Sequence, residues 1–243
     1  MGAFAHHGCV CFLTGITVTV PDQIITALEV QKRNKDRVNV YLNGEFAFGL
    51  SALEAVRLHK GQRLSDAEVN ALREADVRQQ AVESAAHFLG YRPRSMAEVR
   101  QNLAAKEFAP EVIEAAVERL KEMGFVDDAA FARYWAQNRT EFKPLSRRAL
   151  KVELRRKGVA DDAIGEALSD VDESASAYQA ATKQVRKLRG LTKREFKLKL
   201  GAFLQRRGFS SETTQDTVLR LIDELEAQDA AVFQPLNPTT DEE

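Results

Sequence analysis

Basic side chains are spaced along one stretch of the sequence so that they would fall on one face of a helix. Arg148, Lys151 and Arg155 stand at positions i, i+3 and i+7, beside the apolar pair Leu150 and Leu154. Residues at these spacings are neighbours on a helix surface. Guanidinium and ammonium groups bind phosphates and carboxylates, so this pattern predicts a surface for an anionic partner.

Motifs for catalysis or cofactor binding are absent from the sequence. It contains neither G-x-x-x-x-G-K-[ST] nor G-x-G-x-x-G, the loops that cradle nucleotide phosphates. His59 is expected in a turn and His87 within a helix, and the carboxylates fit helix caps and solvated faces instead of a paired catalytic arrangement. We therefore predict a binding protein that is not an enzyme, with no catalytic residues and no cofactor.

The first 24 residues leave two interpretations open. His6, His7, Cys9 and Cys11 are soft-metal ligand types, but no second ligand cluster follows that would complete a tetrahedral site, so no metal site is predicted. The segment is expected to be a disordered leader or an upstream extension of the true start. The sequence has no disulfide framework and no run of ~18 apolar residues, which predicts a cytoplasmic protein without a membrane partner.

Between residues 25 and 50 the apolar residues alternate with polar ones. Asn43 and Gly44 separate two such runs, and this dipeptide is a strong hairpin signal because both residues tolerate a positive φ. A small antiparallel element of two or three strands is predicted here. Further on, the apolar period becomes helical, and Ser51-x-x-Glu54 and Ser65-x-x-Glu68 each fit the capping box that starts a helix.

The helical part of the sequence repeats itself three times. The copies begin at the capping hydroxyls of Ser95, Ser146 and Thr192. Each copy has an amphipathic helix before and after it, so three tandem units of three helices are predicted, and stacking would bury their apolar faces. Apolar residues occupy the fourth and eighth positions after each cap: Val99 and Leu103, Leu150 and Leu154, Phe196 and Leu200.

The predicted fold is mainly α, with tandem three-helix repeats that form an elongated, curved solenoid and a small N-terminal β-hairpin element. Such an array with charged faces is expected to be a monomer. The predicted parts are a leader (1–24), the hairpin with its helices (25–76), the three repeats (77–126, 127–173 and 174–228) and an acidic tail (229–243).

Charge is segregated between the helices of each repeat, although the formal net charge is only −1. The fifth position after each cap is basic in all three copies, whereas the helices that follow are acidic. One interpretation is a basic stripe for an extended anionic partner. The alternative is that basic helices merely neutralise the acidic helices of the same bundle. The predicted partner-binding residues are Arg92, Arg94, Arg100, Arg148, Lys151, Arg155, Arg156, Arg194 and Lys197.

Four stretches of the sequence resemble the RecX family of bacterial recombination regulators. They are "ALEVQKRNKDRVNVYLNGEFAFGL", "YRPRSMAEVRQNLAAKEF", "LKEMGFVDDAAFARYWAQNR" and "SRRALKVELRRKGV". The resemblance runs from about Ile25 to about Glu226, and the middle copy departs from its neighbours by having Ala149 where they have a capping-box Glu.

The resemblance implies a protein that binds the RecA recombinase filament on single-stranded DNA, in the helical groove or at the growing end. Such binding would suppress strand exchange, DNA-dependent ATP hydrolysis and co-protease activity, with ATP held by the recombinase. Two other functions remain open. One is a sequence-nonspecific module that contacts bare DNA directly, and the other is a scaffold whose acidic helices form the main surface.

Overall fold

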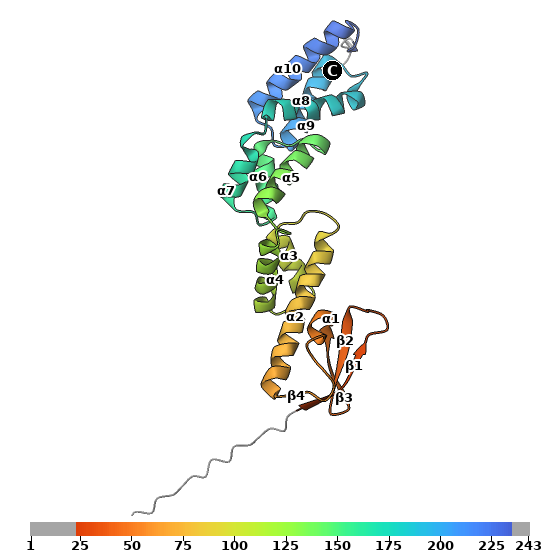
Figure 1. Cartoon of the computed structure of the whole chain (residues 1–243). Helices are drawn as coiled ribbons and strands as arrows, with labels where there is room; N and C mark the ends of the chain where they lie inside the picture. The colour runs from red at the N-terminus through yellow and green to blue at the C-terminus, as the bar shows by residue number, and fades with distance from the viewer. Residues whose placement is uncertain (1–22, 235–243) are drawn as a thin grey trace, which may run out of the picture. The chain divides into compact units, whose positions relative to one another are not determined.

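The computed structural model describes residues 23–234, in which strands are followed by helices (Figure 1). These residues divide into two compact units, one ending at Gln79 and the other starting at Gln80. The histidines and cysteines considered as metal ligands, and most of the predicted leader, lie outside the described residues.

The first unit contains a four-stranded antiparallel sheet with the order β3-β2-β1-β4. Asn43 and Gly44 join β2 to β3 with φ values of 52° and 94°, which confirms the predicted hairpin. Ile25, Val40 and Leu50 are fully buried in the core of this unit. The strands are β1 (Gln23–Val30), β2 (Arg37–Leu42), β3 (Glu45–Ser51) and β4 (Arg63–Leu64).

Two helices accompany the sheet, and both begin at the predicted capping residues. Ser51 accepts a hydrogen bond from the Glu54 backbone at the start of α1 (Ala52–Ala55). Ser65 and Glu68 form both halves of a capping box, at 2.8 and 3.3 Å, at the start of α2 (Asp66–Leu89). α2 runs from the first unit into the second, where its last part becomes the first helix of the first repeat.

The second unit contains three successive groups of three helices, which confirms the repeat prediction. Each group has its own cluster of buried apolar side chains. The first combines the end of α2 with α3 (Met96–Ala104) and α4 (Pro110–Glu122); the second has α5 (Asp128–Phe142), α6 (Arg147–Arg156) and α7 (Asp161–Ser169); the third has α8 (Glu173–Val185) with the 3₁₀ turn η1 (Arg186–Leu188), α9 (Lys193–Arg206) and α10 (Ser211–Gln228).

The middle helix of each repeat begins and ends in the same way. The residues at the fourth and eighth positions after the cap are all fully buried. Each helix then stops in a Schellman motif, in which the amide of an apolar residue donates to the carbonyl of a leucine five positions earlier. These pairs are Phe108 with Leu103 at 3.4 Å, Val159 with Leu154 at 3.2 Å, and Phe209 with Leu204 at 3.3 Å.

Within residues 23–234, no helix is both long enough and apolar enough to cross a membrane. In that same part of the chain, no group of three His, Cys, Asp or Glu side chains lies close enough together to hold a metal ion.

Candidate partner-binding surface

The helix α6 carries the predicted basic pattern of Arg148, Lys151 and Arg155. Ser146 caps it by accepting a hydrogen bond from the Ala149 backbone at 3.1 Å. Leu150 and Leu154 are fully buried, whereas Arg148 is exposed and Lys151 half-buried. The helix therefore has the predicted orientation, with its leucines in the core and a basic face beside them.

One cation on the middle helix of each repeat pairs with the acidic helix that follows. Arg100 of α3 binds Glu114 of α4 through two nitrogens, the shortest distance being 2.8 Å. The hydrogen bond that Arg100 donates to Glu114 raises the pKa of Arg100 above its ordinary value. The corresponding contacts are Arg155 to Asp161 at 2.7 Å and Lys193 to Glu226 at 2.8 Å.

These three pairs are what the neutralisation interpretation predicts. They occupy Arg100 and Arg155, two of the predicted partner-binding residues. The pairs are solvent-exposed, however, and exposed ion pairs contribute little to stability. A strong anionic partner can therefore displace the internal carboxylates at little cost.

Arg92 and Arg94, two of the predicted partner-binding residues, lie in the turn before α3 and are engaged inside the protein. Arg92 contacts the Glu98 carboxylate at 2.9 Å. The Arg94 guanidinium lies 4.1 Å from the centre of the Phe88 ring, and burial lowers the pKa of Arg94. Both side chains thus hold the turn in place, and their availability to a partner is correspondingly reduced.

The side chains of the other five predicted residues have no hydrogen-bond or ion-pair partner within residues 23–234. Arg148 and Arg194 share the second position after the cap, and Lys151 and Lys197 share the fifth, so the same two positions recur on α6 and α9. We call these residues the basic set: Arg148, Lys151, Arg156, Arg194 and Lys197.

A cluster of charged side chains that the sequence did not predict joins the first repeat to the second. Glu98 accepts hydrogen bonds from Arg92 at 2.9 Å and from Lys157 at 2.8 Å, and the Ser95 hydroxyl donates to the Lys157 carbonyl at 2.5 Å. Burial by itself raises the pKa of Glu98, but the hydrogen bonds from Arg92, Lys157 and the Ser95 backbone, with the charge of Lys157, lower it to about 2. The carboxylate is therefore ionised throughout the neutral range.

The same cluster extends onto the aromatic face of α5. Lys157 lies 4.3 Å from the centre of the Trp135 ring, and Arg139 lies 4.3 Å from that same ring. The Trp135 indole donates to Glu153 at 2.9 Å, and Arg139 donates to the same carboxylate at 2.8 Å. Trp135 is therefore fixed in an internal network.

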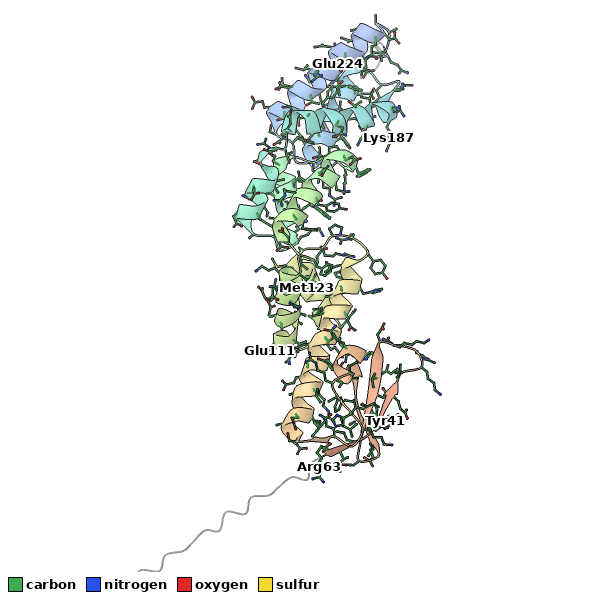
Figure 2. The ribbon with its side chains drawn as sticks, in the orientation of Figure 1. Tyr41, Arg63, Glu111, Met123, Lys187 and Glu224 are labelled. Atoms are coloured by element: carbon green, nitrogen blue, oxygen red, sulfur yellow. The ribbon has the colours of Figure 1, made fainter. Side chains whose placement is uncertain are left out.

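Cation–ring packing also occurs in the third repeat. The Arg220 guanidinium lies 4.2 Å from the centre of the Tyr178 ring, and the Tyr178 hydroxyl donates to Glu224. Figure 2 labels Glu224, which lies on α10. Arg220 donates to the same carboxylate at 2.8 Å. Here too an aromatic side chain is tied to an internal charge pair.

Comparison with known proteins places this arrangement in a family. Models of that family match in succession along the chain: the regulatory protein RecX N-terminal domain over residues 23–65, and the first, second and third three-helix domains of RecX over residues 81–120, 127–168 and 171–218.

Individual relatives and a solved structure agree with these matches. Regulatory protein RecX of Lactobacillus delbrueckii subsp. bulgaricus is 34% identical over 206 residues, which are 83% of this chain and 76% of that protein. The Bacillus subtilis protein of the same name is 32% identical over 207 residues, covering 83% and 77%. A crystal structure of regulatory protein RecX aligns with a TM-score of 0.64 at 26% identity, over 83% of this chain and 99% of that one. The chain belongs to the RecX family of regulatory proteins.

Proposed function

We propose that this chain is a non-enzymatic negative regulator of homologous recombination that binds the RecA–DNA filament, in its groove or at its end. By binding there it suppresses the ATPase, strand-exchange and co-protease activities of the recombinase. The partner is a protein–DNA assembly in the cytoplasm, and the chain acts on it as a monomer.

The observation that carries this proposal is the recurrence of the basic set. In each repeat, one cation of the middle helix pairs with the acidic helix that follows. The cations at the second and fifth positions after the cap, on both α6 and α9, have no ion-pair partner within residues 23–234. Cations without internal partners at repeated positions suit a ligand whose negative charges are themselves repeated. A filament of protein on DNA presents such charges at regular intervals.

The test is the single-strand-dependent ATPase of the recombinase, measured with this chain at substoichiometric amounts. We expect suppression by the wild type and its loss in the charge reversal Arg148→Glu/Lys151→Glu/Lys197→Glu. The control is Arg119→Glu/Lys121→Glu on α4, whose side chains are 61% and 54% exposed and pair only within their own helix. An unchanged ATPase rate with the wild type, together with intact filaments by microscopy, would overturn the proposal.

The basic set also suits a second function, direct and sequence-nonspecific binding to bare DNA. Its signature would be an affinity that falls with salt, with a slope of roughly −0.7 per phosphate contact on single strands. A salt series on bare single strands and on recombinase-coated strands separates the two functions. Tight binding to bare DNA, without preference for coated DNA, favours the second.

A further inference from the structure

The two joints between successive repeats are built from the same parts. In the first joint, the Ser95 hydroxyl at the start of α3 donates to the Lys157 carbonyl at the end of α6. In the second joint, the Ser146 amide at the start of α6 donates to the Arg207 carbonyl at the end of α9, at 3.2 Å. A glycine follows each carbonyl residue, so both joints bring a helix start against a glycine turn.

The approach of the backbones is close in both joints. A Cβ atom on Gly158 would collide with the Ala97 Cβ, and one on Gly208 would lie 2.6 Å from the Ser146 Oγ and 3.0 Å from the Ala149 Cβ. Both glycines also have a positive φ, of 77° and 90°. Both joints therefore place a glycine turn against a helix start, although the glycine meets the second residue after the cap in the first joint and the cap and the third residue after it in the second.

In the first joint two cations contact a carboxylate closely, and a third, Arg94, lies 4.0 Å from it. Glu98, the third residue after its cap, contacts Arg92, three residues before the cap, and Lys157, the residue before the glycine. The Glu98 and Lys157 side chains are only 16% and 19% exposed. Two opposite charges can be buried together because their mutual attraction offsets the free-energy cost of removing them from water.

The second joint has cations at the two corresponding sequence positions and no carboxylate, and Leu145 stands where the first joint has Arg94. Lys143 stands three residues before the cap, where the first joint has Arg92, and Arg207 precedes the glycine, where the first joint has Lys157. Ala149 occupies the position of Glu98.

Arg207 is half-buried without a counter-ion. It donates to the Pro144 carbonyl at 2.8 Å and lies 4.7 Å from the centre of the Phe203 ring. No carboxylate among residues 23–234 forms an ion pair with it. Burial lowers the pKa of Arg207, which is the result expected for a desolvated cation with no negative partner.

We propose that the second joint is a carboxylate-binding site, in which Arg207 and Lys143 receive an acidic side chain of a protein partner at the place that Glu98 fills in the first joint. The guanidinium fork matches a planar carboxylate, and the first joint shows such a group held by the corresponding cations. That the acidic side chain belongs to the recombinase rests on the proposed function, whereas the site itself does not.

The first experiment supplies the carboxylate from within the chain. Ala149→Glu completes a capping box and places the new group at the site. We expect the folding equilibrium to shift towards the folded state by about tenfold, as for a hydrogen bond to a charged group, and most of this gain to vanish in the Arg207→Met background. Ala149→Gln provides the cap without the charge and is expected to gain less. If Arg207→Met does not fold, Lys143→Met takes its place in this double-mutant cycle.

The second experiment measures whether filling the site excludes the partner. Ala149→Glu is expected to weaken binding to recombinase-coated single strands several-fold, whereas Ala149→Gln binds as the wild type does. Val152→Glu, at a 41% exposed position of the same helix, controls for the added negative charge.

The outcomes separate the site from the proposed function. The proposed site is refuted if Ala149→Glu raises the free energy of unfolding equally in the wild-type and Arg207→Met backgrounds. It is also refuted if Ala149→Glu lowers that free energy in both. A selective loss of affinity for bare DNA, with binding to coated strands unchanged, overturns the choice of a carboxylate in favour of a phosphate. If the wild type does not bind the filament at all, the proposed function fails while the cycle with Arg207 still decides whether the site exists.

Discussion

The Glu98 carboxylate accepts a hydrogen bond from the Lys157 ammonium at 2.8 Å, across 59 positions of sequence. Glu98 lies in the middle helix of the first repeat and Lys157 caps the end of the middle helix of the second, so this contact ties one repeat directly to the next. It also places a charge pair in a poorly solvated joint, where removing one partner leaves the other uncompensated.

Glu98→Gln is therefore expected to destabilise the protein in a pH-dependent way. The pKa of Glu98 is about 2 in the folded protein against 4.5 ordinarily, so its stabilising contribution is complete above pH 4.5 and is lost as the pH falls towards 2. At 1.36 kcal/mol per pKa unit the full contribution is at most ~3 kcal/mol. Urea denaturation at pH 7 and at pH 3 measures it.

In that measurement the difference between wild type and Glu98→Gln should shrink at the lower pH. Glu118→Gln on α4, where the side chain is 62% exposed, is the control and should change little at either pH. A difference of the same size at both pH values would contradict the ionised pair.

Gly158 and Gly124 provide a matched pair for testing the close approach at the first joint. Both have a positive φ, of 77° and 74°, so alanine incurs a similar backbone cost of ~1–2 kcal/mol at each. Only Gly158 faces a neighbouring Cβ, that of Ala97, whereas nothing lies within 4 Å of a Cβ on Gly124. Gly158→Ala should therefore lower the free energy of unfolding by at least 1 kcal/mol more than Gly124→Ala does, in the range of overpacking costs. Equal effects would show that the joint has room.

Glu107 occupies the same place in the first repeat with an ordinary side chain. Its φ is 63°, a conformation that disfavours every residue with a Cβ except in special settings. Glu107→Gly should relieve this strain and stabilise the protein by ~0.5 kcal/mol, after the greater entropy of glycine in the unfolded chain is subtracted. Glu107→Ala retains the Cβ and should show no such gain in the same thermal melts.

Leu154 and Lys151 separate stability from binding on α6. Leu154 is fully buried, and Leu154→Ala should cost ~2–5 kcal/mol. Lys151→Ala should cost little stability but weaken binding to coated filaments, because Lys151 has no ion-pair partner within residues 23–234. Thermal melts and filament binding, measured on both variants, test the two halves; a larger melting shift for Lys151→Ala would refute the orientation of α6.

The repeat was predictable from sequence because its signal is local. Apolar residues four and eight positions after a cap lie on one face of any helix, so Leu150 and Leu154 could be assigned to the core. The hairpin was predictable for a similar reason, since Asn43 and Gly44 determine the turn by themselves. The strand β4 was missed because two residues are too few to show an alternating pattern.

The contacts of the charged residues were harder to predict because they depend on neighbours far away in sequence. Arg100 and Lys197 share one position in the repeat, yet Arg100 has Glu114 opposite it and Lys197 has no such partner in the described chain. Glu98 looked only like a capping residue. Its second role requires Lys157, and only the stacking of two repeats brings that residue to it.

The residue type at the turn that ends each middle helix differs between the first repeat and the two repeats that follow it. Gly158 and Gly208 are required because another repeat lies against them, on the side towards the start of the sequence. In the first repeat no preceding repeat lies against this turn, so Glu107 occupies it in spite of its strained backbone. The residue at this turn thus acts as a marker of polarity. In a new sequence of this kind, a glycine there would indicate a repeat that follows another, and a side chain would indicate the leading one.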